Sequence, residues 1–270
     1  MSTVQPAARP PQGPRGPVGA AAVELDALLD GRERVDVRTL GPDALLARRH
    51  DVKAVVDHAA VEQVLTAVPA GWQVATAGAS VRMPYHTVYF DGPDLDLFRD
   101  HRQGRLRRLK VRTRRYEDGT TLLEVKLRGP KRLAEKPRRP HHAHGQLGPD
   151  DLAWIADVVR DRLGRELPEA LAPSAWTAYE RTVLRSPDGT ERLTLDLALT
   201  TGHDGHAAAP ATAAIVELKS LAPRSSLLPV LHRAGSRPVR LSKYALAVNA
   251  AHHVAANRWR PAARRLGRAG

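Results

Sequence analysis

The chain of 270 residues contains no cysteine, and aromatic residues make up only 4% of it. The absence of cysteine excludes disulfides, thiolate metal sites and cysteine nucleophiles. No apolar run approaches the ~20 residues that a membrane-spanning helix needs, and residues 1–17 lack an apolar stretch of the signal-peptide type. We therefore expect a cytoplasmic protein without a membrane span, whose core is built on Leu, Val and Ala.

Acidic residues are too few to balance the basic ones. The chain has 42 Lys and Arg against 29 Asp and Glu, which gives a formal net charge of +13. Such an excess predicts an anionic partner, and it leaves nucleic acid, polyphosphate, nucleotide and membrane surface open. Nucleic-acid readers usually expose aromatic residues among basic ones, so the scarcity of aromatics makes nucleic acid the less favoured partner.

Turn signals and alternating hydrophobicity predict antiparallel hairpins with a few helices between them. Glu117-Asp118-Gly119 connects strands 106–116 and 120–128, and Pro187-Asp188-Gly189 connects strands 175–185 and 191–200. Further strands are predicted at 47–56, 87–90, 213–218 and 239–241, and helices at 23–29, 58–68, 95–101, 149–163, 225–233 and 243–253. This pattern predicts an α+β fold around a closed antiparallel sheet.

Charged and apolar residues alternate along several of these strands. Lys110, Arg112 and Arg114 share one face of their strand, and apolar residues alternate with them. The other such faces are Glu124, Lys126 and Arg128; Arg192, Thr194 and Asp196; and Glu217 with Lys219. Each polar face could simply meet water. If the sheet closes and its apolar faces pack outward against helices, the cations instead line a lumen that needs an anionic ligand, and phosphate satisfies several such donors together.

The stretch YFDGPDLDLFRDHRQGRLRRLKVRTRRYEDG, residues 89–119, resembles the signature of the VTC domain. This is the catalytic domain of the vacuolar transporter chaperone polyphosphate polymerases and of bacterial relatives. The segments that follow the same family order are RHDVK (49–53), LEVKLR (123–128), YERT (179–182), RLTLD (192–196), VELKS (216–220) and LSKY (241–244). The resemblance implies membership of the triphosphate tunnel metalloenzymes, whose fold is a closed eight-stranded antiparallel β-tunnel with flanking helices.

The resemblance also implies a reaction and a set of residues. The reaction is transfer of the γ-phosphate of ATP to a polyphosphate chain, with Glu217 holding a divalent Mn²⁺ or Mg²⁺. The implied catalytic residues are Lys53, Arg112, Arg114, Lys126 and Lys243. The implied phosphate-binding residues are these five together with Arg181 and Arg192, Lys219, which shares a face with Glu217, and Lys136 or Arg138. No strong general base is required, because a terminal phosphate is already anionic at neutral pH.

The resemblance covers roughly residues 45–250, and we expect one tunnel domain at residues 36–256, between a loosely packed or disordered segment at 1–35 and a loose basic tail at 257–270. Two departures from the family pattern occur around Lys53. Ala54 follows it where the family often has an aromatic residue, and the spacing Arg49-x-Asp51-x-Lys53 lacks the first Glu of hydrolytic tunnel relatives. A tunnel-type triphosphatase and a non-catalytic polyanion or polyphosphate binder therefore stay open as alternatives.

Several polar and aromatic residues have simpler interpretations than a role in catalysis. We expect Glu124 to pair with a neighbouring Arg rather than a metal, whereas Asp196 could support Arg192. We interpret His141, His142 and His144 as a polar loop. The remaining aromatic candidates are Tyr116 and Tyr179, expected as barrel side chains, and Trp154, expected in the core.

Overall fold

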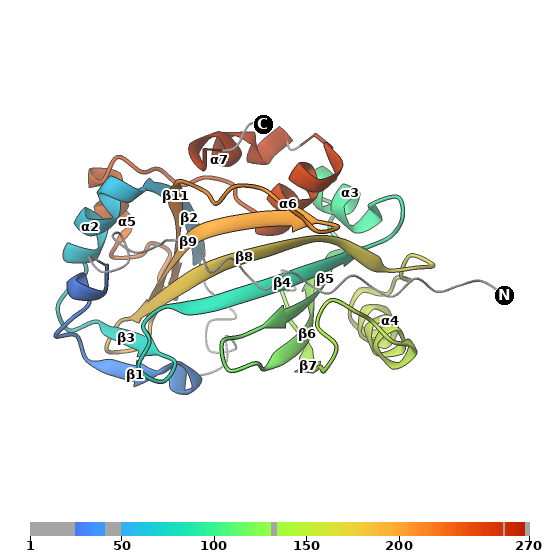
Figure 1. The fold of residues 1–270 in the computed structure, drawn as a ribbon, viewed down its shortest axis with the longest axis horizontal. Coiled ribbons are helices and arrows are strands. Elements are labelled where there is room, and N and C mark those ends of the chain that lie inside the picture. The colour runs from blue at the N-terminus through green and yellow to red at the C-terminus, as the bar shows by residue number, and fades with distance from the viewer. Residues whose placement is uncertain (1–24, 41–49, 131–133, 256, 268–270) are drawn as a thin grey trace.

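The computed structural model describes residues 25–40, 50–130, 134–255 and 257–267. A long, curved sheet runs through the molecule, and helices lie around its outer side (Figure 1). The strands are β1 (Arg34–Asp36), β2 (His50–Asp57), β3 (Gln73–Thr76), β4 (Met83–Asp91), β5 (Arg108–Arg115), β6 (Thr121–Arg128), β7 (Arg138–Pro140), β8 (Ala172–Arg185), β9 (Glu191–His203), β10 (His206–Ala207) and β11 (Ala213–Ser220). The predicted α+β class is confirmed.

The main path of the sheet has the order β2-β11-β9-β8-β4-β5-β6-β7, and all neighbours along it are antiparallel. Off this path β1 pairs with β3 in parallel, β3 pairs with β8, and β10 pairs with β9. Among the described strands β2 and β7 end the path and do not pair with each other, so the expected closure into an eight-stranded tunnel is not confirmed. The sheet is open and strongly curved instead.

The predicted phase of the strands is confirmed, because their apolar faces pack outward. The apolar face of β5 and β6 packs on Ile155, Val159 and Leu163 of the helix at 149–163. The apolar faces of β2, β9 and β11 pack on a second helix, at 58–66. Burial of these faces stabilises the sheet by about 25 cal/mol for each Å² of apolar surface. It therefore directs the charged faces to the concave side.

The helices are α2 (His58–Thr66), α3 (Asp96–Gln103), α4 (Pro149–Leu163), α5 (Leu228–Arg233), α6 (Lys243–His252) and α7 (Arg260–Arg265), with 3₁₀ turns η1 (Val37–Leu40) and η3 (Asn257–Trp259). The sequence predicts α4 to the residue. Its first turn is capped by Asp151, whose carboxylate accepts the Gly148 amide at 2.9 Å, and Gly164 at φ +58° ends it. In the described residues, no helix is long and apolar enough to cross a membrane.

Some predicted segments differ from the structure. The strand at 239–241 is wrong, since this segment makes only a bridge of Pro238 with Ala54 and a bond from the Val239 amide to the Lys53 carbonyl. The expected loose tail is wrong for residues 257–267, because Trp259 and Leu266 are buried against α6 and α3 residues. In the N-terminal segment residues 1–24 lie outside the described part, and residues 25–35 pack through Leu25 and Leu29.

Candidate functional site

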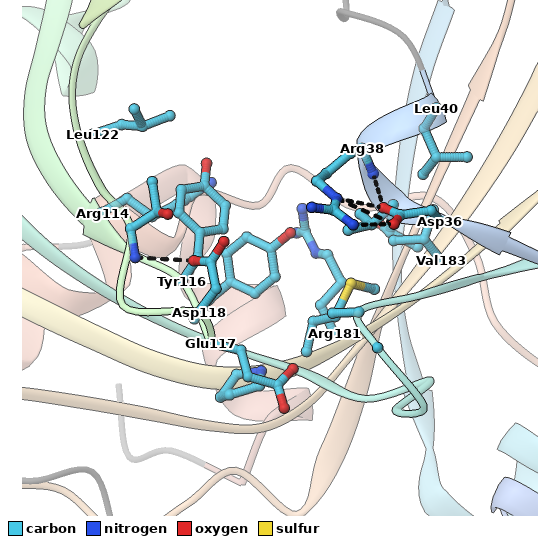
Figure 2. A pocket seen from close by; sticks show the side chains of 18 of the residues that line it. Asp36, Arg38, Leu40, Arg114, Tyr116, Glu117, Asp118, Leu122, Arg181 and Val183 are labelled. Atoms are coloured by element: carbon cyan, nitrogen blue, oxygen red, sulfur yellow. Dashed lines mark hydrogen bonds and ion pairs between the residues drawn. The ribbon is translucent and has the colours of Figure 1, made fainter. Parts of the chain in front are cut away.

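The concave side of the sheet holds a cavity of about 890 Å³ beside the β5–β6 turn (Figure 2). Arg114 and Arg181 reach toward it from β5 and β8, next to Tyr116 (Figure 2). Of the residues that the sequence predicts as phosphate binders, those that line this cavity are Arg114, Lys136, Arg138, Arg181, Arg192 and Lys219. The others lie on the charged faces of β2, β5 and β6 or at the start of α6.

Glu217 on β11 is held between two lysines. It lies directly opposite Lys53 on β2, whose Nζ is 2.7 Å from its Oε1, and the Nζ of Lys219 is 3.9 Å from the same oxygen. Burial opposes ionisation of Glu217, but the charges of Lys219 and Lys53 outweigh it and hold its pKa well below the usual range. The carboxylate is therefore ionised, and its second oxygen, Oε2, takes no bond from any described residue.

Glu124 on β6 forms a second centre of this kind. It lies opposite Arg112 on β5, whose guanidinium is 2.6 Å from Oε2, and Lys136 Nζ is 3.4 Å from Oε1. Burial would raise the pKa of Glu124, yet Arg112, Arg114 and Lys136 together lower it. The predicted ion pair with a neighbouring arginine is confirmed.

Asp196 on β9 is the third carboxylate of this face, and it is buried. Arg181 on β8 contacts it through two bonds of 2.5 and 2.8 Å, and Lys243 donates to Oδ2. Burial would raise the pKa of Asp196, but Arg181 and Lys243 lower it to about 2. These partners differ from the expected one, since Arg192 Nη2 donates to the Leu40 carbonyl at 2.9 Å.

The start of α6 brings a further basic group to the concave side. Ser242 caps the helix by accepting the Ala245 amide, as its position before the helix predicts. Its hydroxyl also accepts Lys110 Nζ at 3.0 Å and contacts His101 Nε2 at 3.1 Å. Lys110 and Ser242 were therefore missed as site residues, although the alternation along β5 already gave Lys110 the same face as Arg112.

Lys126 on β6 shares the concave face with Glu124 and responds to charges on several strands. Its side chain is open to solvent, yet protein atoms ring it closely enough to lower its pKa to about 8. Besides burial, the charges that act on it include Glu217 of β11 and Lys53 and Asp51 of β2. The charged residues of β2 and β11, at one end of the sheet path, therefore act electrostatically on this lysine near the other end.

Three tyrosines surround the arginines of the cavity. Tyr85 stacks on Tyr179 with ring centroids 5.4 Å apart, and Tyr116 meets its edge at 5.2 Å. The guanidinium carbons of Arg114 and Arg181 lie 5.3 and 5.2 Å from the Tyr85 ring. Tyr85 was missed because the predicted strand began at 87, whereas β4 begins at Met83 and places Tyr85 in phase with Thr87 on the concave face. Tyr116 and Tyr179 lie with Tyr85 on the concave side of the open sheet rather than inside a closed barrel.

The cavity rim and the histidine loop complete the surroundings. Asp36 and Arg38, from the β1–η1 segment, form a 2.6 Å ion pair at the rim opposite the β5–β6 turn (Figure 2).

His141 contacts the Ala143 carbonyl and Asp151, His144 contacts His86, and His142 is exposed, so the three histidines do not converge. Trp154 packs against the core as expected, with Arg139 over its ring. Arg49, from the RHDVK motif, lies outside the described residues.

The comparison with known families decides the relationship. Residues 48–252 match the family model of the VTC domain, which is more than half of the chain. The chain belongs to the VTC domain family. The resemblance seen in the sequence motifs is thereby confirmed, and the matched region holds all the charged residues described above except Asp36 and Arg38.

Similar solved structures are remote from this VTC domain. HpAC1 from Hippeastrum, a protein reported to have a dominant triphosphatase activity, is 17% identical with a TM-score of 0.46, covering 74% of this chain and 95% of that one. PH1819 from Pyrococcus horikoshii OT3 is 14% identical with a TM-score of 0.38, covering 72% and 96%. The inorganic triphosphatase NE1496 is 14% identical with a TM-score of 0.27, covering 65% and 75%. At these values the structures add nothing to the family assignment, and no curated protein matches the chain.

Proposed function

We propose that this VTC domain is a polyphosphate polymerase that transfers the γ-phosphate of ATP to a polyphosphate chain. The observation that carries the proposal is the convergence of basic side chains on the concave face around the cavity. They come from β2, β5, β6, β7 and the segment before it, β8, β9, β11 and the start of α6. They are Lys53, Arg112, Arg114, Lys126, Lys136, Arg138, Arg181, Arg192, Lys219 and Lys243. Phosphoryl transfer needs positioning and charge neutralisation more than a covalent nucleophile, and these residues supply both.

The residues around Glu217 fit a divalent metal that also binds phosphate. Its carboxylate is ionised and keeps Oε2 free of bonds from the described residues, whereas Oε1 faces Lys53 and Lys219. Mg²⁺ and Mn²⁺ are typically held by one or two carboxylates together with substrate phosphate oxygens, so a single carboxylate suffices here. When bound, the metal would neutralise charge on the phosphates. Lys53 and Lys219 would hold Glu217 in place and add two positive charges beside it.

The basic residues divide naturally between the two reactants. Arg114 and Arg181 both lie against the Tyr85 ring at the cavity beside the β5–β6 turn, where Arg114 is buried and Arg181 is half-buried. Arginine binds phosphate oxygens in a bidentate manner, and pre-fixed arginines lose little entropy when they do so. We assign the triphosphate to this cavity and place its transferred phosphate near Glu217, whose pKa Arg181 also helps to lower.

Incubation of the purified protein with γ-labelled ATP and Mn²⁺, resolved on a gel, tests this function. We expect a ladder of anionic polymer. Glu217→Gln should lose the several kcal/mol of charge stabilisation that a metal supplies, roughly a hundredfold to a thousandfold in rate, while ATP binding survives. Orthophosphate release without polymer would contradict a polymerase and identify a triphosphatase. Binding without any turnover would identify a non-catalytic polyanion binder.

A further inference from the structure

The end of the β5–β6 pair that lies away from the Glu117 turn carries two successive pairs of like charge. Arg108 lies directly opposite Arg128, and Lys110 lies directly opposite Lys126. All four alternate in phase with Arg112, so they share the concave face. Like charges directly opposite one another destabilise an antiparallel pair, and only the next pair, Arg112 with Glu124, is compensated.

A third arginine reaches this end from the C-terminal segment. Trp259 is buried and stacks on His101 with ring centroids 4.8 Å apart, and the guanidinium carbon of Arg258 lies 5.9 Å from the centroid of the Trp259 ring. Burial, followed by the charges of Arg128 and Arg258, lowers the pKa of Arg108. Burial, followed by the charges of Lys110, Arg108 and Arg258, also lowers the pKa of His101 to about 2. The basic residues of three separate segments therefore share one region.

The carboxylates nearest to this region are already engaged or distant. Asp100 pairs with Arg165 at 2.5 Å and Arg105 at 3.4 Å, and Glu217 is held by its two lysines. In the part of the chain that the structure describes, neither Arg108 nor Arg128 forms an ion pair with a carboxylate. A cluster of cations that the protein does not neutralise is a binding site for an external anion.

We propose that Arg108, Arg128 and Arg258 form an outer subsite for inorganic polyphosphate, distinct from the cavity at Arg114 and Arg181. Alternate residues of a strand lie about 6.7 Å apart, so the row from Arg108 to Arg114 is roughly 20 Å long. A chain with a charge on every unit can engage the whole row, whereas a triphosphate engages only part of it. The subsite rests on the proposed function for its ligand, and it makes affinity depend on chain length.

Calorimetric titration of the full chain with tripolyphosphate, and with polyphosphate tens of units long, tests the subsite. Arg128→Gln and Arg258→Gln should each weaken binding of the long chain by about tenfold and leave tripolyphosphate binding unchanged. Arg233→Gln, at an exposed position on α5, is the matched control and should change neither. Circular dichroism checks that the variants fold.

Equal losses for both ligands, or no loss for either, would overturn the subsite. A single-stranded oligonucleotide of equal charge that competes as well as the long polyphosphate would also overturn it, because the cluster would then be a nucleic-acid site. Selective loss of long-chain binding stands whether or not the protein makes polymer. Failure of polymer synthesis would therefore remove the proposed reaction alone.

Discussion

The two ends of the concave face use the same residue types in opposite ways. Around Glu124, Asp196 and Glu217 each carboxylate holds two cations, so half of the positive charge on these six cations is compensated before any ligand arrives. Around Arg108 and Arg128 cations face cations. The first arrangement stabilises the fold and pre-orients phosphate-binding groups. The second lowers the stability of the free protein, and a bound polyanion relieves the repulsion. The same alternating strand pattern can thus stabilise the fold at one end of the concave face and bind a polyanion at the other.

The largest effect in this comparison is expected from Asp196→Asn. The substitution leaves the half-buried Arg181 and Lys243 without their buried counter-charge, and removing one partner of a buried ion pair costs about 3–5 kcal/mol. Urea unfolding followed by circular dichroism should show this loss, and saturating tripolyphosphate should restore part of it. An unfolding free energy equal to that of the wild type would show that Asp196 does not hold the two cations together.

The next effect is expected on ligand binding. Arg114→Ala should weaken tripolyphosphate binding by about 1.5–3 kcal/mol, because a hydrogen bond to a charged phosphate is lost. Its neighbour Arg115 occupies the other face of β5, so Arg115→Ala is the matched control and should leave the affinity unchanged. If calorimetry gives equal losses for both variants, the concave face is not the binding face.

A pH dependence follows from Lys126, whose pKa in the free protein is lowered to about 8. A bound polyanion favours the charged form, so binding above pH 8 takes up a proton and the affinity falls by up to about tenfold between pH 7 and pH 9. Calorimetry in two buffers of different ionisation enthalpy measures this uptake. Proton release on binding, or the same uptake in Lys126→Met, would contradict the assignment.

The smallest effect distinguishes the two ends by sign. Without ligand, Arg128→Gln should stabilise the fold by about 0.2–1 kcal/mol, because it removes one member of a like-charge pair. Arg112 lies on the same strand pair but faces Glu124, so Arg112→Gln should instead destabilise the fold because buried Glu124 loses a partner. Salt should diminish the gain from Arg128→Gln. Changes of the same sign in both variants would remove the distinction between the ends.

The strand faces and the helices could be predicted from the sequence, because both follow from the local alternation of apolar and polar residues. The apolar faces of β5 and β6 lie outward as expected, and α4 begins and ends where its capping residues indicate. The short strands β1, β3 and β7 were missed because three or four residues contain too little alternation to recognise. The partner of each strand depends on long-range register, so the open path of the sheet could not be read from the same pattern.

The site shows the same division between local and long-range information. The basic residues were found by alternation and by resemblance, and their shared face is confirmed for Lys110, Arg112 and Arg114. Their partners were not predictable, since Lys243 meets Asp196 across 47 residues and Lys53 meets Glu217 across 164. These contacts depend on which strands become neighbours, and local spacing carries no information about that.

A crystal structure with tripolyphosphate and Mn²⁺ bound tests most directly whether cations on the concave face bind a chain of phosphates. We expect phosphate oxygens within hydrogen-bond distance of Arg114 and Arg181, with the metal against Oε2 of Glu217. Phosphate bound only on the outer, helix-covered side of the sheet, with Glu217 and both arginines unchanged, would contradict the central claim.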